Sequence, residues 1–566
     1  MEKRVLLAVS LSFVVLFLYQ TLVVRNQPPP RSSPRQVPQP TSQGQAPASE
    51  APAELEPAPT PVPKVAPLVG DSAERDIVME SPEVVAVFTT RGGELKHWRL
   101  KRYLDAAGQP LDLIPSGLPP DIPRPFALSV QDPPTTQVLR EALYKPSADR
   151  IEAQQAADLT FEYSDAGGLC VRKVFRLDPV KSPYVLTVTS TVERNGERLN
   201  PTVHLGPAVA GAPASASSYY QKPQAIFYRS ADMNRVSGSD LANQPVHEGP
   251  FEFAGVDDNY FLSAVVAPDA ALRVEYRLVT TAASGAAAQE YVAYSARFEK
   301  EPSAVPVFLG PKEFDTLAAV HRDLVRAINF GMFSWLCVPL LRSLKWIYGY
   351  VGNYGWAIVI LTVLINLMMF PLRHKSVVSM RKMQELQPEV KAIQDRYAKL
   401  KATDPARQKM NVELMNLYRE RGVNPASGCI PMLLTLPVLF AFYSLLSQAV
   451  EIRGAPFILW IRDLSAHDPW YVTPLLMGGT MIWQQWITPM SGDPMQQKMM
   501  MFMPIVFTAM FLWVPSGLVL YWTVSNIWGI GQQYVTNSII GPPKHMRPAA
   551  ERRLKQAGSG KSKGAE

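Results

Sequence analysis

Several stretches of this 566-residue chain are apolar enough to cross a lipid bilayer, and this feature constrains the fold more than any other. The segment Ile360–Arg373, ILTVLINLMMFPLR, is almost wholly apolar, yet it contains one amide side chain, Asn366. A polar group that faces lipid costs free energy, so such a residue needs a polar or hydrated partner inside the membrane. The chain is therefore expected to hold polar side chains at membrane depth.

Six apolar runs are candidates for transmembrane helices. The first, Val5–Val24, follows two basic residues and is about 20 residues long, enough to cross the hydrocarbon core. No small-residue cleavage pattern follows it, so an uncleaved signal anchor over residues 1–25 is favoured over a cleaved signal peptide. The other five runs lie at residues 353–372, 429–448, 470–488, 499–515 and 517–535.

Between the first and second runs the composition changes twice. Residues 26–74 are rich in Pro, Ala, Gln and Ser, which is typical of a flexible tether. Residues 75–318 show period-two patterns broken by turn residues, as in YVLTVTSTVE at Tyr184–Glu193 and LRVEYRLVTT at Leu272–Thr281. Many short strands of this kind predict a large β-sandwich domain.

Residues 319–350 have helical spacing but are not uniformly apolar. Arg342 and Lys345 interrupt the apolar face, and aromatic residues surround them. This composition is typical of an amphipathic helix that lies in the membrane interface.

The distribution of charge predicts the orientation. The net charge is +7, and residues 373–428 are strongly basic, with twelve Lys or Arg against six Asp or Glu up to residue 421. The tail, residues 541–566, is also basic, and basic segments stay in the cytoplasm. The two termini and the 373–428 loop are therefore expected in the cytoplasm, and the β-domain in the periplasm of a bacterium.

The 373–428 loop has two helical halves separated near Pro405, which predicts a helical hairpin. It is either an ordinary solvated surface or a docking arm for an anionic or apolar partner such as a ribosome or a nascent chain. The candidate residues of such an arm are Arg381, Lys382, Met383, Met410, Met415 and Arg419.

Polar residues in the apolar runs recur at helical spacing. Thr362 and Asn366 are four residues apart, as are Tyr521 and Ser525, so each pair shares one helix face. The pattern indicates either interhelical hydrogen bonds that hold the bundle together or a hydrated groove for a substrate. The candidate groove residues from the residue pattern are Thr362, Asn366, Thr435, Tyr443, Gln484, Tyr521, Ser525 and Gln532.

The sequence contains no pattern typical of a catalytic site or a cofactor site. The seven histidines are scattered without an HExxH pattern, and the three cysteines form no CxxC, so no metal site is expected. The Gly-Lys-Ser at residues 560–562 lacks the rest of a phosphate loop. No cofactor and no enzyme activity are expected. A secondary transporter or channel-like membrane protein is the alternative, although the runs show neither repeated halves nor intramembrane acids.

Several long motifs resemble the YidC/Oxa/Alb family of membrane protein insertases. They include VGNYGWAIVILTVLINLMMFPL, DPMQQKMMMFMPIVFTAMFLWVPSGLVLYW and, in the β-domain, TRGGELKHWRL. The resemblance covers nearly the whole chain. It implies a periplasmic β-supersandwich and, within residues 351–540, a five-helix core around a hydrophilic groove open to cytoplasm and lipid.

The resemblance also implies a function. Members of the family insert and help fold nascent inner-membrane proteins, alone or with the SecYEG translocon, accessory Sec proteins, ribosomes and the targeting machinery. No nucleotide hydrolysis is expected, and a monomer in the lipid bilayer is anticipated. The groove positions carried over are Thr362, Tyr521 and Trp522. One departure stands out: many members have an arginine where this chain has Asn366, so a buried positive charge is not expected at this depth.

Overall fold

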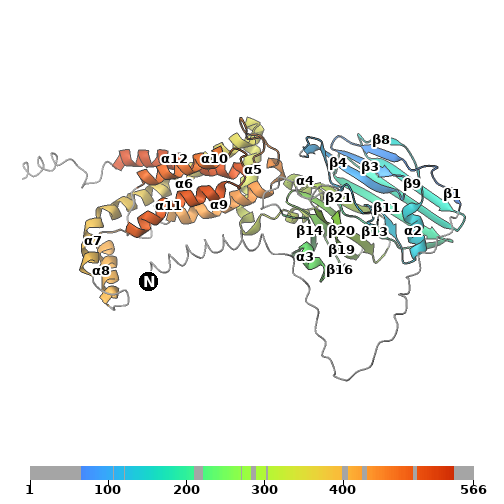
Figure 1. The fold of residues 1–566 in the computed structure, drawn as a ribbon, viewed down its shortest axis with the longest axis horizontal. Helices are drawn as coiled ribbons and strands as arrows, with labels where there is room; N and C mark the ends of the chain where they lie inside the picture. The colour runs from blue at the N-terminus through green and yellow to red at the C-terminus, as the bar shows by residue number, and fades with distance from the viewer. Residues whose placement is uncertain are drawn as a thin grey trace, which may run out of the picture. The chain divides into compact units, whose positions relative to one another are not determined.

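The computed structural model describes residues 66–105, 107–119, 121–209, 221–268, 271–281, 289–300, 304–397, 406–423, 430–488 and 494–540. The expected signal anchor over residues 1–25 and the basic tail over residues 541–566 lie outside the described residues. The strand-rich part, in blue to green, and the helical part, in yellow to red, are seen in Figure 1.

The strand-rich part contains three sheets among the described residues. The largest has eleven strands in the order β1-β9-β10-β11-β21-β18-β17-β14-β15, with β12 paired to β11 and β7 to β9. The other two have the orders β16-β19-β20-β13-β6 and β5-β4-β3-β2-β8. The strands are β1 Pro67–Val69, β2 Asp76–Glu80, β3 Val84–Thr89, β4 Glu94–Leu104, β5 Pro110–Asp112, β6 Leu128–Ser129, β7 Lys145–Pro146, β8 Arg150–Glu152, β9 Ala157–Asp165, β10 Leu169–Leu177, β11 Val185–Arg194, β12 Glu197–Leu199, β13 Thr202–His204, β14 Gln224–Arg229, β15 Asp232–Val236, β16 Val246–Gly249, β17 Phe253–Asp257, β18 Phe261–Val266, β19 Leu272–Thr281, β20 Gln289–Phe298 and β21 Val305–Pro311.

Strands β11 and β19 confirm the period-two interpretation. In β11, Leu186, Val188 and Val192 are buried, because alternate side chains of a strand point to the same face. Strand β1 falls inside residues 26–74, the range assigned to the tether, because its backbone pairs with β9.

The core of the strand-rich part is aromatic. The Phe175 ring lies 4.7 Å from Phe88, 5.3 Å from Phe126 and 5.9 Å from Phe161, measured between ring centroids. Trp98 is fully buried, and its indole Nε1 donates a hydrogen bond to the carbonyl of Leu309 at 2.8 Å. These contacts join strands from distant parts of the sequence, so the sheets form one β-sandwich core.

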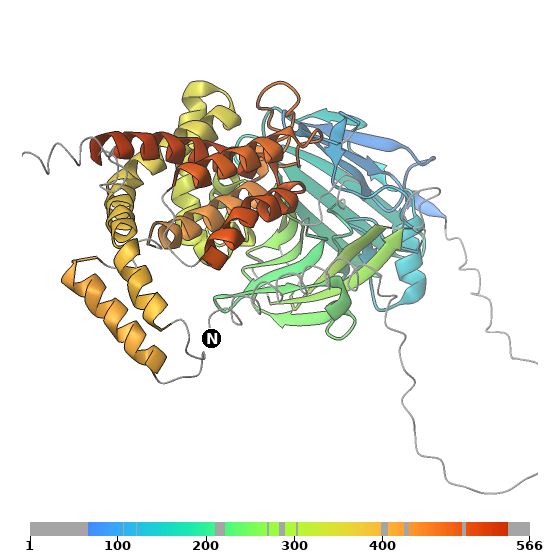
Figure 2. The ribbon, with the colours of Figure 1, turned by 60° about the vertical axis from the view of Figure 1, so that its left-hand side comes forward.

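The helical elements lie mainly in the C-terminal part of the chain. They are α2 Pro133–Glu141, α3 Gly238–Leu241, α4 Phe314–Val320, η2 Leu324–Ala327, η3 Gly331–Phe333, α5 Ser334–Val351, α6 Tyr354–Glu385, α7 Gln387–Arg396, α8 Ala406–Glu420, α9 Ile430–Gln448, η5 Val450–Ile452, α10 Val472–Ile487, α11 Pro494–Phe511 and α12 Ser516–Ile540. Helix α12 packs against α6, α10 and α9, and α10 also packs against α11 (Figure 2).

Helix α5 is shorter than the amphipathic helix expected over residues 319–350. It begins at Ser334 after two short 3-10 turns and ends where Gly352 adopts the left-handed conformation, with φ 65°. Its Trp335 and Trp346 side chains are exposed, whereas Leu344 is fully buried. The helix therefore presents one aromatic face outward and one apolar face to its neighbours.

Helix α6 continues beyond the expected end of the second apolar run. Pro371 lies inside it without ending it, although a proline removes one backbone hydrogen bond. Two contacts hold the later turns against α12: His374 Nδ1 lies 3.3 Å from Thr536 Oγ1, and Arg381 Nη2 donates to Asn537 Oδ1 at 2.6 Å. The neighbouring helix thus supports the segment after the proline.

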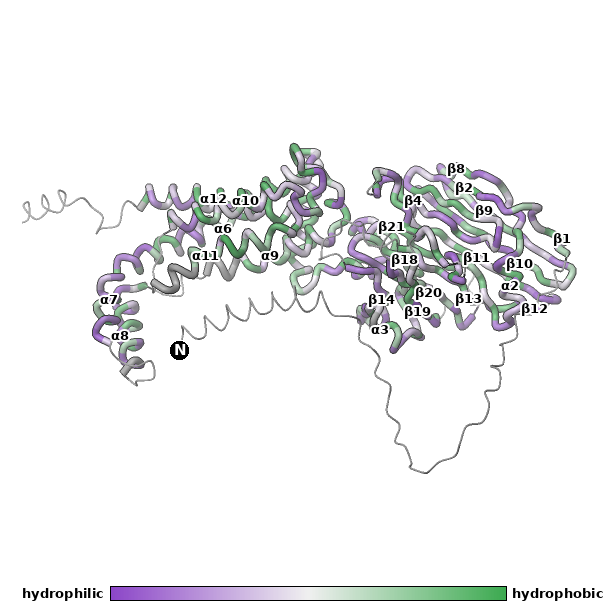
Figure 3. The backbone as a smooth tube through the Cα atoms, viewed as in Figure 1, coloured by the Kyte–Doolittle hydropathy of each residue, from purple (hydrophilic) through white to green (hydrophobic). Residues whose placement is uncertain are grey.

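Among the described residues, α6 is the helix that is long and apolar enough to cross a membrane, judged by length and composition. Two shorter apolar helical segments are Thr435–Gln448 and Met500–Phe511. In Figure 3, hydrophobic colour predominates along much of α6, α9 and α10, whereas α7 carries hydrophilic colour.

Helices α7 and α8 form a compact unit by themselves. Arg421 Nη2 bonds both carboxylate oxygens of Glu389 at 2.9 Å, and Arg396 Nη2 lies 3.3 Å from Glu413 Oε2. Ion pairs therefore join the two helices on their polar sides.

Candidate functional site

Asn366 lies in a buried polar pair on α6. Its side chain is only 2% exposed and Thr362 is fully buried. The Asn366 amide nitrogen donates to the Thr362 carbonyl at 2.8 Å and to Ser525 Oγ of α12 at 3.3 Å. The Asn366 Oδ1 atom, however, is buried and accepts no hydrogen bond from the described residues. An unsatisfied buried acceptor of this kind costs about 1–3 kcal/mol.

A second amide side chain, on α12, also has a buried oxygen atom without a hydrogen-bond donor. Gln532 of α12 donates from Nε2 to the Phe370 carbonyl of α6 at 3.3 Å, while its Oε1 is buried without a hydrogen-bond partner in the described structure. Ser525 and Gln532 are seven residues apart, two helical turns on one face. We name Thr362, Asn366, Ser525 and Gln532 the α6–α12 seam. Two of its side-chain oxygen atoms, Asn366 Oδ1 and Gln532 Oε1, are buried and accept no hydrogen bond from the described residues.

Aromatic rings flank this seam on α12. Tyr521 stacks on Phe442 of α9, with ring centroids 4.3 Å apart and an interplanar angle of 17°. Trp522 packs against α11, 5.0 Å from Phe511 and 5.6 Å from Phe507. Tyr521 and Trp522 thus face different helices, one on each side of α12.

The candidates on α9 and α10 are less central. Thr435 and Tyr443 are half-buried on α9, and the residue that precedes Tyr443, Phe442, stacks on Tyr521. Gln484 of α10 is half-buried and lies against Gly529 of α12, where an added Cβ would come within 2.4 Å of Gln484 Nε2. A larger residue at position 529 would therefore displace the Gln484 amide.

Sequence reasoning missed the polar contact between α10 and α12. Asn526 of α12 donates from Nδ2 to Thr480 Oγ1 of α10 at 3.1 Å, and both side chains are buried. Each is a polar residue inside an apolar run, and Thr480 is four residues before Gln484. The same spacing argument would have marked Thr480 as a polar position on the face of Gln484, but its contact with Asn526 depends on how α10 and α12 pack.

The hairpin candidates divide between two elements. Arg381, Lys382 and Met383 lie in the last turns of α6, not in a separate hairpin, because α6 continues past Pro371 along α12. Met410, Met415 and Arg419 lie on α8. Met415 and Arg419 are exposed there, and Met410 is half-buried. The structure therefore attaches the first three residues to the helical core.

The fold and the seam define a class of protein. Apolar helices with a buried polar seam are joined to a mainly antiparallel β-sandwich, which is the organisation of an integral membrane protein with a large domain outside the bilayer.

Comparison with known proteins identifies the family. The family model described as YidC periplasmic domain matches residues 76–343, and the model described as 60Kd inner membrane protein matches residues 346–542. "Membrane protein insertase YidC" of Geobacter metallireducens is 37% identical over 95% of this chain and 99% of its own length. The protein of the same name from Syntrophus aciditrophicus is 35% identical, with the same coverage. The crystal structure of YidC from Thermotoga maritima matches at 14% identity, over 81% of this chain and 99% of that chain, with a TM-score of 0.29.

The chain belongs to the YidC family of membrane protein insertases, which are bacterial inner-membrane proteins with a periplasmic domain and are not catalytic enzymes.

Proposed function

We propose that this protein inserts nascent membrane proteins into the bacterial inner membrane and helps them fold, without nucleotide hydrolysis. The observation that carries the proposal is the pair of open acceptors, Asn366 Oδ1 and Gln532 Oε1, on a seam between otherwise apolar helices. Water or the backbone N–H groups of a passing polypeptide supply the missing donors. We propose that a hydrophilic groove, open to cytoplasm and lipid, runs along the α6–α12 seam. In the structure itself this seam is closed, with Thr362 fully buried and Asn366 2% exposed.

The groove acts on the polar part of the substrate. A short polar tail that must cross the bilayer finds hydrogen-bond partners partway across, so the barrier to its transfer falls. The apolar segment of the substrate slides outward into lipid and supplies the driving force. Each strongly apolar residue contributes roughly 0.3–0.6 kcal/mol on the membrane-insertion scale.

The proposed topology has six transmembrane helices, five of which form the core. The first is the signal anchor over residues 1–25, and the others are built on α6, α9, α10, α11 and α12. Both termini lie in the cytoplasm with the basic residues of α7 and α8, and the β-sandwich lies in the periplasm. The loop between α9 and α10 carries more acidic than basic residues, which supports its periplasmic placement.

Partners follow from this arrangement. Helices α7 and α8 capture the chain as it leaves the ribosome or the targeting machinery, and the exposed Val412 and Met415 of α8 offer apolar contacts for it. The protein works as a monomer in the lipid bilayer, alone or with SecYEG and the accessory Sec proteins.

Reconstitution tests the function directly. The purified protein is placed in liposomes, and a single-span phage coat-type protein is added with and without ATP. We expect protease-protected insertion that requires the protein and is unchanged by ATP. Protein-free liposomes measure spontaneous insertion. Strict dependence on ATP, or solute uptake in place of insertion, would reject the proposal and favour a transporter.

A further inference from the structure

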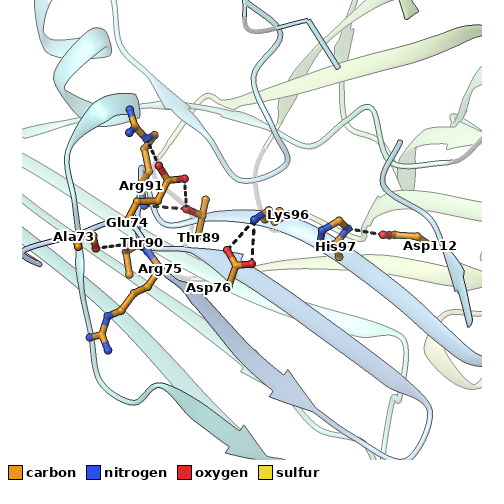
Figure 4. A network of polar contacts seen from close by, with 10 residues as sticks. All are labelled: Ala73, Glu74, Arg75, Asp76, Thr89, Thr90, Arg91, Lys96, His97 and Asp112. Atoms are coloured by element: carbon orange, nitrogen blue, oxygen red, sulfur yellow. Dashed lines mark hydrogen bonds and ion pairs between the residues drawn. The ribbon is translucent and has the colours of Figure 1, made fainter. Parts of the chain in front are cut away.

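A cavity of about 990 Å³ opens in the strand-rich part, away from the helical seam. Its walls are the start of β4, residues 114–119 with Ile122 and Arg124, and one face of α2. The volume falls within the range of roughly 300–1,000 Å³ that is typical of small-molecule sites. Part of the polar network along β3 and β4 at this cavity is shown in Figure 4.

Helix α2 turns one face toward the cavity. The lining residues Pro133, Thr136, Gln137 and Arg140 recur at intervals of three and four, so they lie on the same side of the helix. The Asp132 carboxylate fixes the start of α2 by accepting a hydrogen bond from the Thr135 backbone at 3.1 Å. The position of Arg140 is therefore set by a capped helix.

Strand β4 contributes the opposite wall through a local irregularity. The register places Phe88 opposite Leu95 but Val87 opposite His97, which leaves Lys96 without a partner on β3. Such a bulge redirects neighbouring side chains, and Lys96 and His97 both line the cavity. Both already have acidic partners, Asp76 and Asp112, as Figure 4 shows.

Glu94 stands at the inner end of this wall. It lines the cavity, is only 8% exposed and makes no hydrogen bond or ion pair with any described residue. Beneath it, the buried Lys173 ammonium donates to the carbonyls of Gly92 and Phe126 at 2.6 and 2.7 Å. The Glu94 carboxyl oxygens face the cavity and bond no described residue, so they are available to a ligand there.

Two guanidinium groups face the same space without partners. Arg124 and Arg140 line the cavity, are half-buried and form no ion pair or hydrogen bond within the described part of the chain. Arg91, by contrast, is paired with Glu74 at 2.8 Å. The carboxylates of Glu94 and Glu141 line the same cavity, and the Arg124 and Arg140 charges act on Glu94 from a distance. Two guanidinium groups on different walls still leave donors free for the oxygens of a phosphate monoester, which carries about two negative charges at neutral pH.

We propose that this cavity binds a small phosphate monoester, with Arg124 and Arg140 holding the phosphate and Glu94 bonding an adjacent hydroxyl group. The phosphate comes either from a free phosphorylated molecule or from the headgroup of a lipid. The site lies outside the insertion seam, so its ligand binding is separable from insertion.

Glu94 makes the binding sensitive to pH. Burial raises the pKa of Glu94 to about 7, against the opposing charges of Lys173, Arg140, Arg124 and Arg91 around it. Below this pKa the protonated carboxyl donates a hydrogen bond, whereas above it the carboxylate repels a phosphate. The Glu94→Gln variant keeps the shape of the side chain but cannot lose a proton. Its affinity for the phosphate monoester therefore exceeds that of the wild type by a factor that grows as pH rises from 6 to 8.

Calorimetric titration of the full-length protein tests the site. The protein in phosphatidylcholine nanodiscs is titrated with glycerol 1-phosphate and with inorganic phosphate. We expect saturable binding of glycerol 1-phosphate, weakened at least tenfold in the Arg124→Gln/Arg140→Gln variant. The matched control, Arg172→Gln/Arg176→Gln, removes two exposed arginines of β10 outside the cavity and binds as the wild type does.

Further arms identify the source of the phosphate and guard against misfolding. If a lipid headgroup reaches the cavity, phosphatidic acid in the nanodiscs reduces the binding of glycerol 1-phosphate. If the ligand is a soluble molecule, phosphatidic acid leaves this binding unchanged. Either result supports the site, provided that binding depends on Arg124 and Arg140. Thermal unfolding shows whether the double variant folds, and Glu94→Gln gives a second, independent readout. Absence of saturable binding to the wild type, equal loss in both arginine variants, or a Glu94→Gln advantage that does not change with pH overturns the proposal.

Discussion

Asn366 is the single side chain on which the insertion proposal depends most. Its replacement by leucine removes the donor to Thr362 and Ser525 and the open Oδ1 acceptor, so the seam becomes drier. We expect Asn366→Leu to reduce insertion by roughly fivefold, the effect of one hydrogen bond worth about 1 kcal/mol. Liposome insertion measures it, with Met368→Leu as the matched control on the exposed side of α6. Equal activity of the two variants would contradict the assignment.

Charge at the same position is a separate question. An arginine at mid-membrane costs about 2.5–3.5 kcal/mol on the insertion scale, yet a hydrated seam accepts it at a lower cost. We expect Asn366→Arg to be tolerated, and the wild type to show little preference for a substrate tail with one Asp over a neutral tail of equal length.

The comparison of the two tails in the wild type and in Asn366→Arg decides this point. A strong preference for Asp in the wild type that the arginine leaves unchanged would assign the attraction to another cation. Arg373, seven residues along α6 and about two turns away on the same face, would then be that cation.

At the scale of elements, Lys345 of α5 joins the end of the β-domain to the helices. Its ammonium pairs with Asp315, with Glu313 at 3.3 Å and with Glu451 of η5 at 3.7 Å. Burial raises the pKa of Glu451 to about 7 despite the nearby Lys345 charge, with Glu313 and Asp315 adding to the rise. Because the native state then binds the proton more tightly than the unfolded chain, stability falls as pH rises from about 4.5 to 7.

The Glu451→Gln variant removes this titration. The shift corresponds to at most about 3 kcal/mol of unfavourable free energy in the wild type above pH 7. We expect the variant to unfold at a higher temperature than the wild type at pH 8 and at a similar temperature at pH 5. Thermal unfolding in detergent at the two pH values measures the difference. A constant difference between pH 5 and 8 would show that Glu451 does not titrate in this range.

Helices α7 and α8 carry a second prediction at this scale. Replacing residues 387–421 by a short Gly-Ser linker removes the surface proposed to capture the substrate, but leaves Arg381 bound to Asn537 of α12. We expect delivery from ribosomes to be lost while the thermal stability of the helices is retained. A matched variant that exchanges Arg421 and Glu389 keeps the ion pair and should deliver normally. Normal delivery by the variant without the hairpin would show that α7 and α8 form only a solvated surface.

At the scale of the whole molecule, the β-domain carries no part of the seam. We expect deletion of residues 76–311 to leave insertion close to the wild-type level, provided that α5 and the partners of Lys345 at Glu313 and Asp315 are kept. The same deletion extended through α5 removes Leu344 and Ile347 from the packed core and serves as the destabilised comparison. Complete loss of insertion by the shorter deletion, with the protein stable in the membrane, would assign the β-domain an essential role.

Local patterns in the sequence determined much of the fold. Alternation along Tyr184–Glu193 and Leu272–Thr281 predicted β11 and β19, because the two faces of a strand meet different surroundings. The apolar runs predicted helices in the C-terminal part, and the spacing of Thr362 and Asn366 predicted their shared face. Each of these inferences needs only residues within a few turns of one another.

The tertiary structure alone decided which distant residues meet. The continuation of α6 past Pro371 depends on contacts of Arg381 and His374 with α12, which no local spacing contains. The stacking of Tyr521 on Phe442 depends on how α9 and α12 are rotated. Glu94, Arg124 and Arg140 are far apart along the chain, and sheet register together with the docking of α2 brings them to one cavity. Such contacts arise from packing between elements, so the periodicity of a sequence does not reveal them.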